Sequence, residues 1–365
     1  MAGPRIIIVG AGVYGLAAAR RMALAGAAVT VLEAREAGGS FAASAGSTRV
    51  LRFEYGPDAH YTDIVLRART QWRELERLLG ETLYDETGVL WFAAEETQYL
   101  ADSIATVSAA GLPVRLLEPA EVVRRHPAFS ADGIAAVLED DAGGVLHARR
   151  ATLGLARLAA AAGAELREGA AVRAVGDGVV ELADGTSERA DQVLVATGAW
   201  TSRLLELPIG STQQVNVYLR VQAAGLPVWI YDLDVYGLTD DGGAGLKVGG
   251  HAIGATVDPD DPAAREAPAA EVRRLAETAR RRMPGLPWPA DEEILRGADV
   301  CCYALTASEA PIIERIGERT VVCAGFSGHG FKFASALGPA AGDLVLGAEP
   351  EIDLTPFRRP PVASS

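Results

Sequence analysis

The residues with the clearest chemical meaning are three glycines near the start of the chain and an acid that follows them. Gly10, Gly12 and Gly15 fit the pattern G-x-G-x-x-G. In this pattern the first glycine allows a tight turn, the second lets a pyrophosphate approach the backbone, and the third lets a helix pack on a strand. Glu33 follows about 20 residues later, where a carboxylate can accept hydrogen bonds from the ribose of an adenosine. These residue types at this spacing predict a dinucleotide site.

The segments around these residues have the periodicity that such a site needs. The apolar run from Ile6 to Val9 predicts a buried parallel strand, residues 16–26 predict a helix that ends in glycine, and residues 27–32 predict a second strand. A glycine-rich turn in an unrelated α/β sheet is the alternative, and it gives Glu33 no role. The order strand, glycines, helix, strand and acid therefore favours the dinucleotide site.

The composition argues against several classes of protein. The 365 residues have a formal net charge of -14, whereas binding of nucleic acid needs clustered lysine and arginine. No apolar run approaches the roughly 20 residues that cross a bilayer, and the first strand starts too close to Met1 for a signal peptide. Three cysteines, two of them adjacent, give neither a disulfide framework nor the spacing of metal ligands. We expect a cytoplasmic protein without nucleic-acid, membrane or metal partners.

Further along the chain, segments that suit a nucleotide alternate with segments that do not. Mostly apolar strands at 192–196 and 320–324 each end in small residues, where backbone can lie against a nucleotide. Other predicted elements are helices at 61–80, 95–110, 119–126, 149–163 and 270–283 and strands at 88–93, 144–146 and 214–221. Residues 229–237 are aromatic and acidic, and residues 242–251 are rich in glycine. We predict two interleaved domains, a dinucleotide-binding domain of residues 1–80, 144–212 and 320–365 and a substrate domain of residues 81–143 and 213–319.

Several separated segments resemble one family. They are STRVLRFEYG (47–56), VATGAW (195–200), YGLTDDGGAGLKVGGH (236–251), CCYALTASEAPII (301–313) and GFSGHGFKFASALG (325–338). On these segments, which fall in order between residue 5 and about residue 345, the chain resembles the monomeric sarcosine oxidase and N-methyltryptophan oxidase group of the D-amino-acid-oxidase-like flavoproteins. The resemblance implies FAD as the cofactor. It also implies an α/β fold in which a Rossmann-like FAD-binding domain is interleaved with a substrate domain built on a mainly antiparallel sheet.

The resemblance further implies which residues hold FAD. The glycines of 325–330 bring backbone N–H groups to the flavin, and Cys301 carries a thioether bond to the flavin 8α-methyl. The Cys-x-Tyr register with Tyr303 selects Cys301 over Cys302, although a free cysteine is more often a small core residue. The full predicted set is Gly10, Ala11, Gly12, Val13, Tyr14, Gly15, Glu33, Ala34, Arg35, Ser47, Thr48, Val172, Gly198, Trp200, Cys301, Gly325, Ser327, Gly328, His329, Gly330, Phe331 and Lys332.

By the same resemblance, Lys247 lies beside the flavin and stabilises superoxide as oxygen takes its first electron. A lysine that extends outward to solvent is the alternative. His251, Tyr236 and Tyr303 surround the substrate amine, where neutral imidazole and phenol groups can tune its protonation. A histidine satisfied within the core is the alternative for His251.

Arg52 and Lys332 are implied to hold the substrate carboxylate, which an arginine can bind through two parallel hydrogen bonds. Arg49, three residues before Arg52, is predicted to be catalytic. Without the resemblance, both arginines could belong to a solvated helix face and Lys332 to the surface.

The chain departs from the family at Ala45, where a histidine is frequent, at Ala307–Ser308, and in a shortened segment between Val221 and Tyr236. These departures fall near the substrate, so the cofactor and the reaction type are better supported than the identity of the amine. We predict an FAD-dependent amine oxidase that converts a secondary amine, an N-alkyl or cyclic amino acid, to an imine and reduces O2 to H2O2, as a monomer or weak dimer. A flavin-dependent dehydrogenase that passes electrons to a carrier and a non-catalytic flavin-binding subunit are the alternatives.

Overall fold

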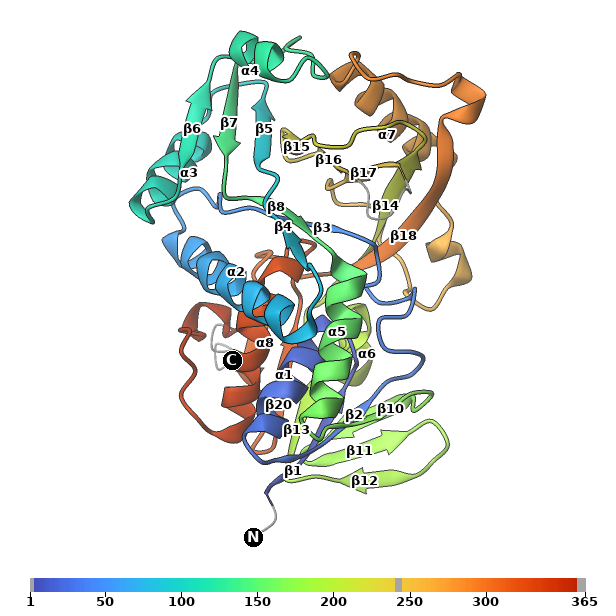
Figure 1. The fold of residues 1–365 in the computed structure, drawn as a ribbon. Coiled ribbons are helices and arrows are strands. Elements are labelled where there is room, and N and C mark those ends of the chain that lie inside the picture. Colours follow the sequence, from blue (N-terminus) through green and yellow to red (C-terminus); the bar gives the residue numbers. More distant parts are fainter. Residues whose placement is uncertain (1–2, 240–244, 360–365) are drawn as a thin grey trace, which may run out of the picture.

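The computed structural model describes residues 3–239 and 245–359, which form two main sheets connected by several crossings of the chain (Figure 1). The first sheet has six strands in the order β19-β20-β13-β1-β2-β9, and all neighbours are parallel except β19 and β20. Its strands are β1 (Arg5–Val9), β2 (Ala28–Leu32), β9 (Glu165–Arg167), β13 (Gln192–Val195), β19 (Ile312–Arg315) and β20 (Thr320–Ala324).

Helices cover the first sheet because its strands are apolar on both faces. Ile6, Ile7 and Ile8 of β1 are all 0% exposed, as β-branched residues in a central parallel strand are expected to be. Small residues let two of the helices pack closely, since a Cβ on Gly338 would lie 2.6 Å from that of Ala17. The covering helices are α1 (Val13–Leu24), α2 (Ala59–Leu79), α5 (Ala148–Ala161) and α8 (Ala334–Leu346).

The first helix begins earlier than the predicted residue 16. Gly12 is its N-cap, so α1 starts at Val13 and Gly15 lies within its first turn. The helix predicted at 61–80 is confirmed as α2. Asp58 caps its start, where the carboxylate accepts hydrogen bonds from two backbone N–H groups, and Gly80, with φ 67°, caps its end.

The second sheet has eight strands in the order β18-β14-β17-β16-β15-β5-β7-β6, and all neighbours are antiparallel except β15 and β5. Leu275, Ala279 and Met283, in and just after α7 (Ala269–Arg282), pack on one of its faces. The strands are β5 (Val89–Ala93), β6 (Val114–Leu117), β7 (Ala136–Asp140), β14 (Gly210–Leu219), β15 (Val228–Tyr231), β16 (Val235–Leu238), β17 (Leu246–Gly250) and β18 (Leu295–Leu305).

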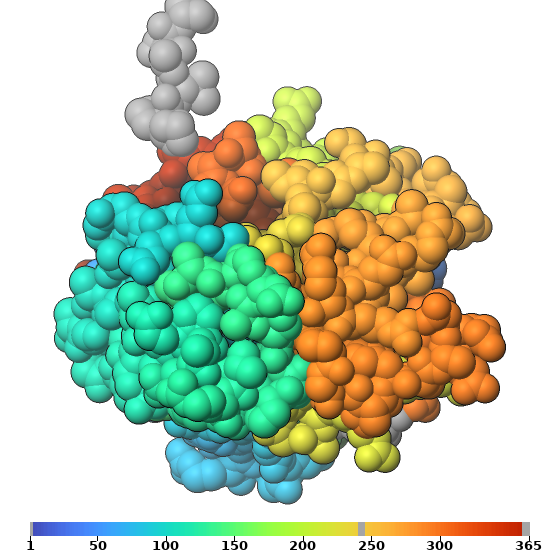
Figure 2. All heavy atoms as spheres, turned by 90° about the horizontal axis from the view of Figure 1, so that it is seen from above, coloured from blue at the N-terminus to red at the C-terminus, as the bar shows by residue number. Residues whose placement is uncertain are grey.

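Two small sheets complete the fold. The sheet β3-β8-β4, made of β3 (Arg49–Leu51), β8 (Gly144–Leu146) and β4 (Tyr84–Asp85), lies between the two large sheets in Figure 1. The antiparallel sheet β10-β11-β12 is made of β10 (Val172–Gly176), β11 (Val179–Leu182) and β12 (Ser187–Arg189). Seen from above, α3 (Gln98–Ala109), α4 (Pro119–Arg125) and their strands form one lobe and residues around α7 and β18 form another, and the two lobes meet along a seam (Figure 2).

The α/β class and the antiparallel second sheet are confirmed, whereas six of its strands were not predicted as strands. They are β6, β7, β15, β16, β17 and β18, and the sequence of β18, LRGADVCCYAL, has no regular alternation of apolar and polar residues. The division into two domains stays a prediction, and β19 departs from it because residues 312–315 pair with β20 in the first sheet. Residues 240–244 of the 236–251 segment lie outside the described residues. No helix in the described part of the chain is both long and apolar enough to cross a membrane.

Candidate active site

A cavity of about 1240 Å³ begins at the carboxyl ends of the parallel strands and continues to the end of β18. Val9 and Leu32 line it at the ends of β1 and β2, Ala196 lines it just after β13, and Tyr303 lines it from β18. Ligands of open α/β sheets bind at this edge, outside the carboxyl ends of the strands. The cavity is therefore placed to hold a nucleotide at one end and to reach the second sheet at the other.

Each glycine of the first loop has the role that the pattern predicts. Gly10 has φ 104°, and a Cβ on it would lie 2.6 Å from the carbonyl oxygen of Ala196. A Cβ on Gly15 would lie 2.0 Å from the carbonyl oxygen of Gly10, so helix and strand can approach only without it. Gly12 lines the cavity, and a Cβ on it would find only the Ser44 hydroxyl, at 3.9 Å. The backbone at Gly12 is therefore open to a ligand.

The acid and the helix start also fit a dinucleotide. The Glu33 carboxylate accepts hydrogen bonds from the backbone N–H groups of Ala11 at 2.9 Å and Arg35 at 3.1 Å. Two carboxylate oxygens offer about four acceptor positions, so Glu33 can still accept from ribose hydroxyls. The first turn of α1 has no side-chain cap and no acidic residue, which leaves its N–H groups for a phosphate.

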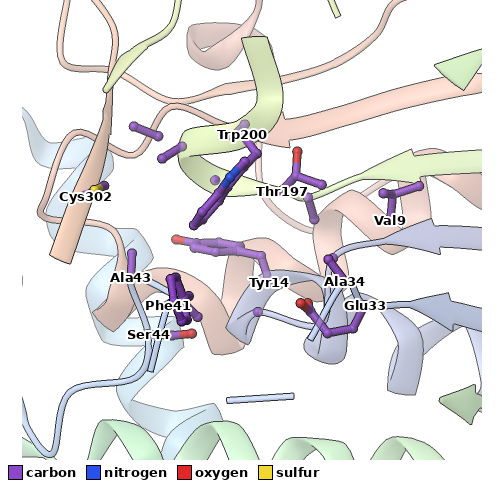
Figure 3. A pocket seen from close by; sticks show the side chains of 18 of the residues that line it. Val9, Tyr14, Glu33, Ala34, Phe41, Ala43, Ser44, Thr197, Trp200 and Cys302 are labelled. Carbon is purple, nitrogen blue, oxygen red and sulfur yellow. The ribbon is translucent and has the colours of Figure 1, made fainter. Parts of the chain in front are cut away.

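Aromatic side chains from separate segments converge on the cavity (Figure 3). Phe41 lies under two guanidinium groups, with the Arg35 carbon 3.9 Å and the Arg265 carbon 4.9 Å from its ring centroid. The Trp200 indole N–H donates to the Asp260 carboxylate at 2.8 Å. Phe41, Asp260 and Arg265 were not predicted, because they belong to a loop and an acidic linker in which no local pattern marks a site.

The loop 325–330 is shaped as much by packing as by ligand binding. Gly325 and Gly328 have φ 75° and 84°, and Ser327 has φ 48°. A Cβ on Gly328 would lie 2.0 Å from the ring of Tyr303, and one on Gly330 would lie 2.4 Å from Phe326. These two glycines are therefore required by neighbouring aromatic rings, a reason that the sequence pattern alone did not give.

Most of the residues predicted to hold the cofactor line the cavity. They are Gly10, Gly12, Val13, Tyr14, Glu33, Ala34, Arg35, Val172, Gly198, Trp200, Gly325, Ser327, Gly328, Gly330 and Phe331. The predicted residues that are not part of its wall are Ala11, Gly15, Ser47, Thr48, Cys301, His329 and Lys332. Arg49 and Tyr303 line the cavity, whereas Tyr236, Lys247, His251 and Arg52 are not part of its wall.

Cys302 rather than Cys301 is part of the cavity wall. Side chains alternate along a strand, so Cys301 shares a face of β18 with Asp299 and Tyr303, and Cys302 lies on the other face. Burial raises the pKa of the Cys301 thiol, and the nearby Arg49 opposes this effect.

Ser47 and Thr48 position polar side chains of the site. The backbone carbonyl of Thr48 accepts from the Lys247 ammonium at 2.9 Å and from the Arg49 guanidinium at 2.7 Å. Burial raises the pKa of the Tyr218 hydroxyl, and the nearby Ser47 opposes this effect. Lys247 is 0% exposed, and burial together with the Arg49 charge lowers its pKa to about 7. We call Arg49 and Lys247 the first cation pair.

Arg52 and Lys332 form a second cation pair around Tyr55. The Lys332 ammonium donates to the Tyr55 hydroxyl at 2.6 Å and to the His329 carbonyl at 2.8 Å, and the Arg52 guanidinium carbon lies 4.7 Å from the Tyr55 ring centroid. Burial and the Arg52 charge hold the pKa of Lys332 well below its ordinary value. Tyr55 was not predicted as a site residue, although it lies three residues after Arg52 in the segment 47–56 that resembles the family.

Neutral side chains lie between the two cation pairs. The His251 and Tyr303 rings meet edge to face with centroids 6.1 Å apart. Burial and the charge of Arg52 lower the pKa of His251 to about 4, and burial raises the pKa of Tyr236 to about 12. His329 is also neutral at pH 7, because burial lowers its pKa to about 3.

Two buried carboxyls lie behind the second cation pair. Glu54, whose backbone carbonyl accepts from Arg52, and Asp140 are both 0% exposed and lie within hydrogen-bonding reach of each other. Both Glu54 carboxyl oxygens and Asp140 Oδ2 have no donor partner. Burial and the neighbouring Glu54 raise the pKa of Asp140 well above its ordinary value. Ionisation of Asp140 is therefore disfavoured in the folded protein.

A family model described as FAD dependent oxidoreductase matches residues 5–344. The chain belongs to this family. It is 32% identical to a monomeric sarcosine oxidase of Bacillus sp. (strain B-0618), over 96% of this chain and 94% of that protein. It is 31% identical to an N-methyl-L-tryptophan oxidase of Citrobacter koseri, over 97% of each chain. Among solved structures, L-proline dehydrogenase from P. horikoshii has the same fold, with a TM-score of 0.85, 22% sequence identity and coverage of 98% of this chain and 96% of that one.

As a member of the FAD-dependent oxidoreductase family the chain uses FAD, and the cavity fits it. The open backbone at Gly12, the uncapped start of α1 and the Glu33 carboxylate suit the adenosine diphosphate part. The wall at Gly325, Gly328 and Tyr303 suits a flat ring, because glycine backbone and an aromatic side chain line the cavity there. The resemblance found in the sequence and the α/β fold are thus both confirmed.

Proposed function

We propose that this FAD-dependent oxidoreductase oxidises a secondary amine with a carboxylate, an N-alkyl or cyclic amino acid, to an imine, and that O2 is reduced to H2O2. The observation that carries the proposal is the separation of two buried cation pairs by neutral histidine and tyrosine side chains. The names of the sequence relatives, which are oxidases of N-methyl amino acids, support the same class of substrate.

The second cation pair suits the substrate carboxylate. Arg52 offers a planar donor group and Lys332 a compact one, and both lie at Tyr55. Two cations this close repel each other in a buried place, so an anion between them is favoured. The pair can thereby fix one end of the substrate and orient the other.

Neutral groups suit the amine end. Oxidation of the C–H bond beside nitrogen requires the free amine, because the nitrogen lone pair becomes part of the imine. His251 and Tyr303 can accept a hydrogen bond from an N–H group without adding charge, and the nearby Arg52 disfavours an ammonium. When bound, FAD supplies the acceptor for the hydrogen and the two electrons that leave the substrate carbon.

The first cation pair suits the oxygen step. Transfer of one electron to O2 creates a negative charge, which a buried cation already in place can stabilise. Lys247 is wholly buried and fixed by the Thr48 carbonyl, so it need not move to do so. We also propose Cys301 as the attachment point of the flavin, since it shares the face of β18 that carries Tyr303.

The test is a two-step mixing experiment. A panel of N-methyl, cyclic and primary amino acids is mixed anaerobically with the protein, and loss of flavin absorbance identifies the substrates. The bleached protein is then mixed with O2, and peroxide is measured. We expect Lys247→Met to slow the second step by orders of magnitude and to spare the first, and equal losses in both steps would contradict the role of Lys247.

A dehydrogenase is the second candidate, because the fold is shared with a protein named as one. Bleaching followed by recovery only with an artificial electron acceptor would favour it over the oxidase. No bleaching with any amine would reject both and favour a non-catalytic flavin-binding subunit.

A further inference from the structure

A row of polar residues crosses four neighbouring strands beside the first cation pair. Asp299 of β18 is paired in register with Asn216 of β14, Asn216 with Gly249 of β17, and Gly249 with Tyr236 of β16. The Asn216 amide N–H donates to Asp299 Oδ1 at 2.9 Å, and the Tyr236 hydroxyl donates to Asn216 Oδ1 at 3.0 Å. The amide has only one orientation that satisfies both bonds, because the carboxylate can only accept. We call these four residues the polar row.

Gly249 makes the polar row continuous. Its strand lies between those of Asn216 and Tyr236, and a Cβ on Gly249 would lie 2.5 Å from the Tyr236 hydroxyl and 2.7 Å from Asn216 Oδ1. Any side chain here would therefore separate the two. The absence of a Cβ lets the tyrosine reach across one strand to the amide, and thereby connects it to the carboxylate of Asp299.

Tyr218 holds the second oxygen of the same carboxylate. It lies two residues after Asn216 on β14, is paired in register with Lys247, and its hydroxyl donates to Asp299 Oδ2 at 2.7 Å. Both Asp299 oxygens are thus fixed by neutral donors. Neither of these hydrogen bonds brings a cation to the carboxylate.

The groups that face Lys247 come from several elements. Arg49 of β3 adds a like charge, and Asp299 and Cys301 of β18 favour the ammonium. Tyr218 is its cross-strand partner, and the carbonyl of Thr48 accepts a hydrogen bond from its ammonium. Asp299 also acts on Arg49 and on Tyr236. Asp299 is therefore the carboxylate that offsets the first cation pair.

On the basis of the proposed function, we propose that Asp299 is a positioning residue that keeps Lys247 in its ammonium form and, through Asn216, fixes the hydroxyl of Tyr236. The simpler alternative is that the polar row only ties β18 to β14. The two differ in one measurable property. A charge that favours the ammonium must change the titration of Lys247 when it is removed, whereas a purely structural tie need not.

The composition of the chain makes this titration accessible. Lys247 and Lys332 are its only two lysines, so protein labelled with 13C at the lysine Cε position gives two side-chain signals. Lys332 is the internal control, since the groups that act on it are Arg52 and Glu54 and not Asp299. Each signal is assigned by replacing one lysine with methionine and is followed against pH in the holoprotein.

Asp299 favours the ammonium of Lys247, and a nearby opposite charge moves a pKa by about 1 to 3 units, so Asp299→Asn should lower the titration midpoint of Lys247 by about one pH unit. Lys332 should titrate as before. Tyr218→Phe is the matched control, because it removes one hydrogen bond and keeps the charge, and its effect should be much smaller. Asp299→Glu keeps the negative charge, so the titration midpoint of Lys247 should lie close to that of the parent protein. If the amide variant does not fold, Asp299→Ser must lower the midpoint in the same way.

An unchanged Lys247 midpoint in the Asp299 variants would overturn the proposal, and so would an equal change in Tyr218→Phe. The lysine titration does not depend on turnover, so a failed amine panel would reject the proposed function and leave this coupling to be judged on its own. A lowered midpoint together with an equal downward change in the pH profile of the O2 reaction would support both.

Discussion

Replacing Lys247 with methionine should stabilise the protein at neutral pH, although it removes a hydrogen bond. Burial and Arg49 lower the pKa of Lys247 from 10.5 to about 7, whereas the unfolded chain has the ordinary value. Between these values the unfolded chain binds a proton that the folded protein does not, so the free energy of unfolding rises with pH across this window. The cost of burying this lysine is therefore fully present below about pH 7.

The size of the effect follows from the same two values. The difference of about 3.5 units between 10.5 and 7 corresponds to about 5 kcal/mol at 1.36 kcal/mol per unit, and no discount for solvent applies because Lys247 is 0% exposed. Methionine removes one donor to the Thr48 carbonyl, which costs about 1 kcal/mol, since Arg49 still donates to it. We expect a net gain of about 3 to 4 kcal/mol near pH 7 and about 1 kcal/mol near pH 9.

Urea unfolding of the holoprotein at several pH values between 6 and 9, followed by circular dichroism, measures this gain. Lys247→Arg is the control, because arginine keeps its charge at every pH and should bring neither a gain nor convergence at high pH. A variant no more stable than the parent at pH 7, or a gain of equal size at pH 7 and pH 9, would show that Lys247 is not held at a lowered pKa.

Three other predictions test separate parts of the site. Arg52→Ala should weaken binding of an amino-acid substrate roughly ten- to a hundred-fold, because a charged hydrogen bond worth about 1.5 to 3 kcal/mol is lost. Anaerobic titration should show little loss for the matching amide, and equal losses would exclude a carboxylate site. Cys301→Ser should release FAD when the protein is precipitated with acid, whereas Cys302→Ser should retain it; the reverse result would move the attachment to Cys302. Glu54→Gln should gain stability over the parent as pH rises from 5 to 9. The raised pKa of Asp140 means that the folded parent keeps a proton and loses stability with pH, and an amide can donate to the Asp140 carboxylate instead. A difference between the urea midpoints of Glu54→Gln and the parent that stays constant from pH 5 to pH 9 would contradict this account.

The nucleotide end of the site could be predicted because its parts are close together in the sequence. β1, the glycine loop, α1 and β2 are consecutive, and each leaves a local pattern of apolar residues or glycine. The roles of Gly10 and Gly15 then follow from the close approach of two backbones, and that of Gly12 from the open space beside it. A single sequence shows directly which elements follow one another and where a glycine loop joins them.

The polar row could not be predicted for the opposite reason. Asp299, Asn216 and Tyr236 meet only because four neighbouring strands, β18, β14, β17 and β16, are paired in one register. A slip of one residue in any pair would turn a side chain to the other face of the sheet. No feature of the segments around these residues fixes that register, and β18 itself lacks a clear strand pattern. Phe41 and Asp260 were missed similarly, because loops approach the cavity only after the sheets have formed.

The two lysines connect composition, stability and chemistry. Of the 34 basic residues, all but Lys247 and Lys332 are arginine, so the chain uses arginine wherever a cation serves the surface. Both lysines are almost fully buried, at 0% and 4% exposure, with pKa values lowered by burial and by a neighbouring arginine. Arginine cannot lose its proton in a protein, whereas a buried lysine can be brought to the point of doing so. At the two positions that have lysine instead of arginine, we infer that the site requires a compact cation whose protonation the neighbouring groups can control. In the first cation pair we assign that control to Asp299.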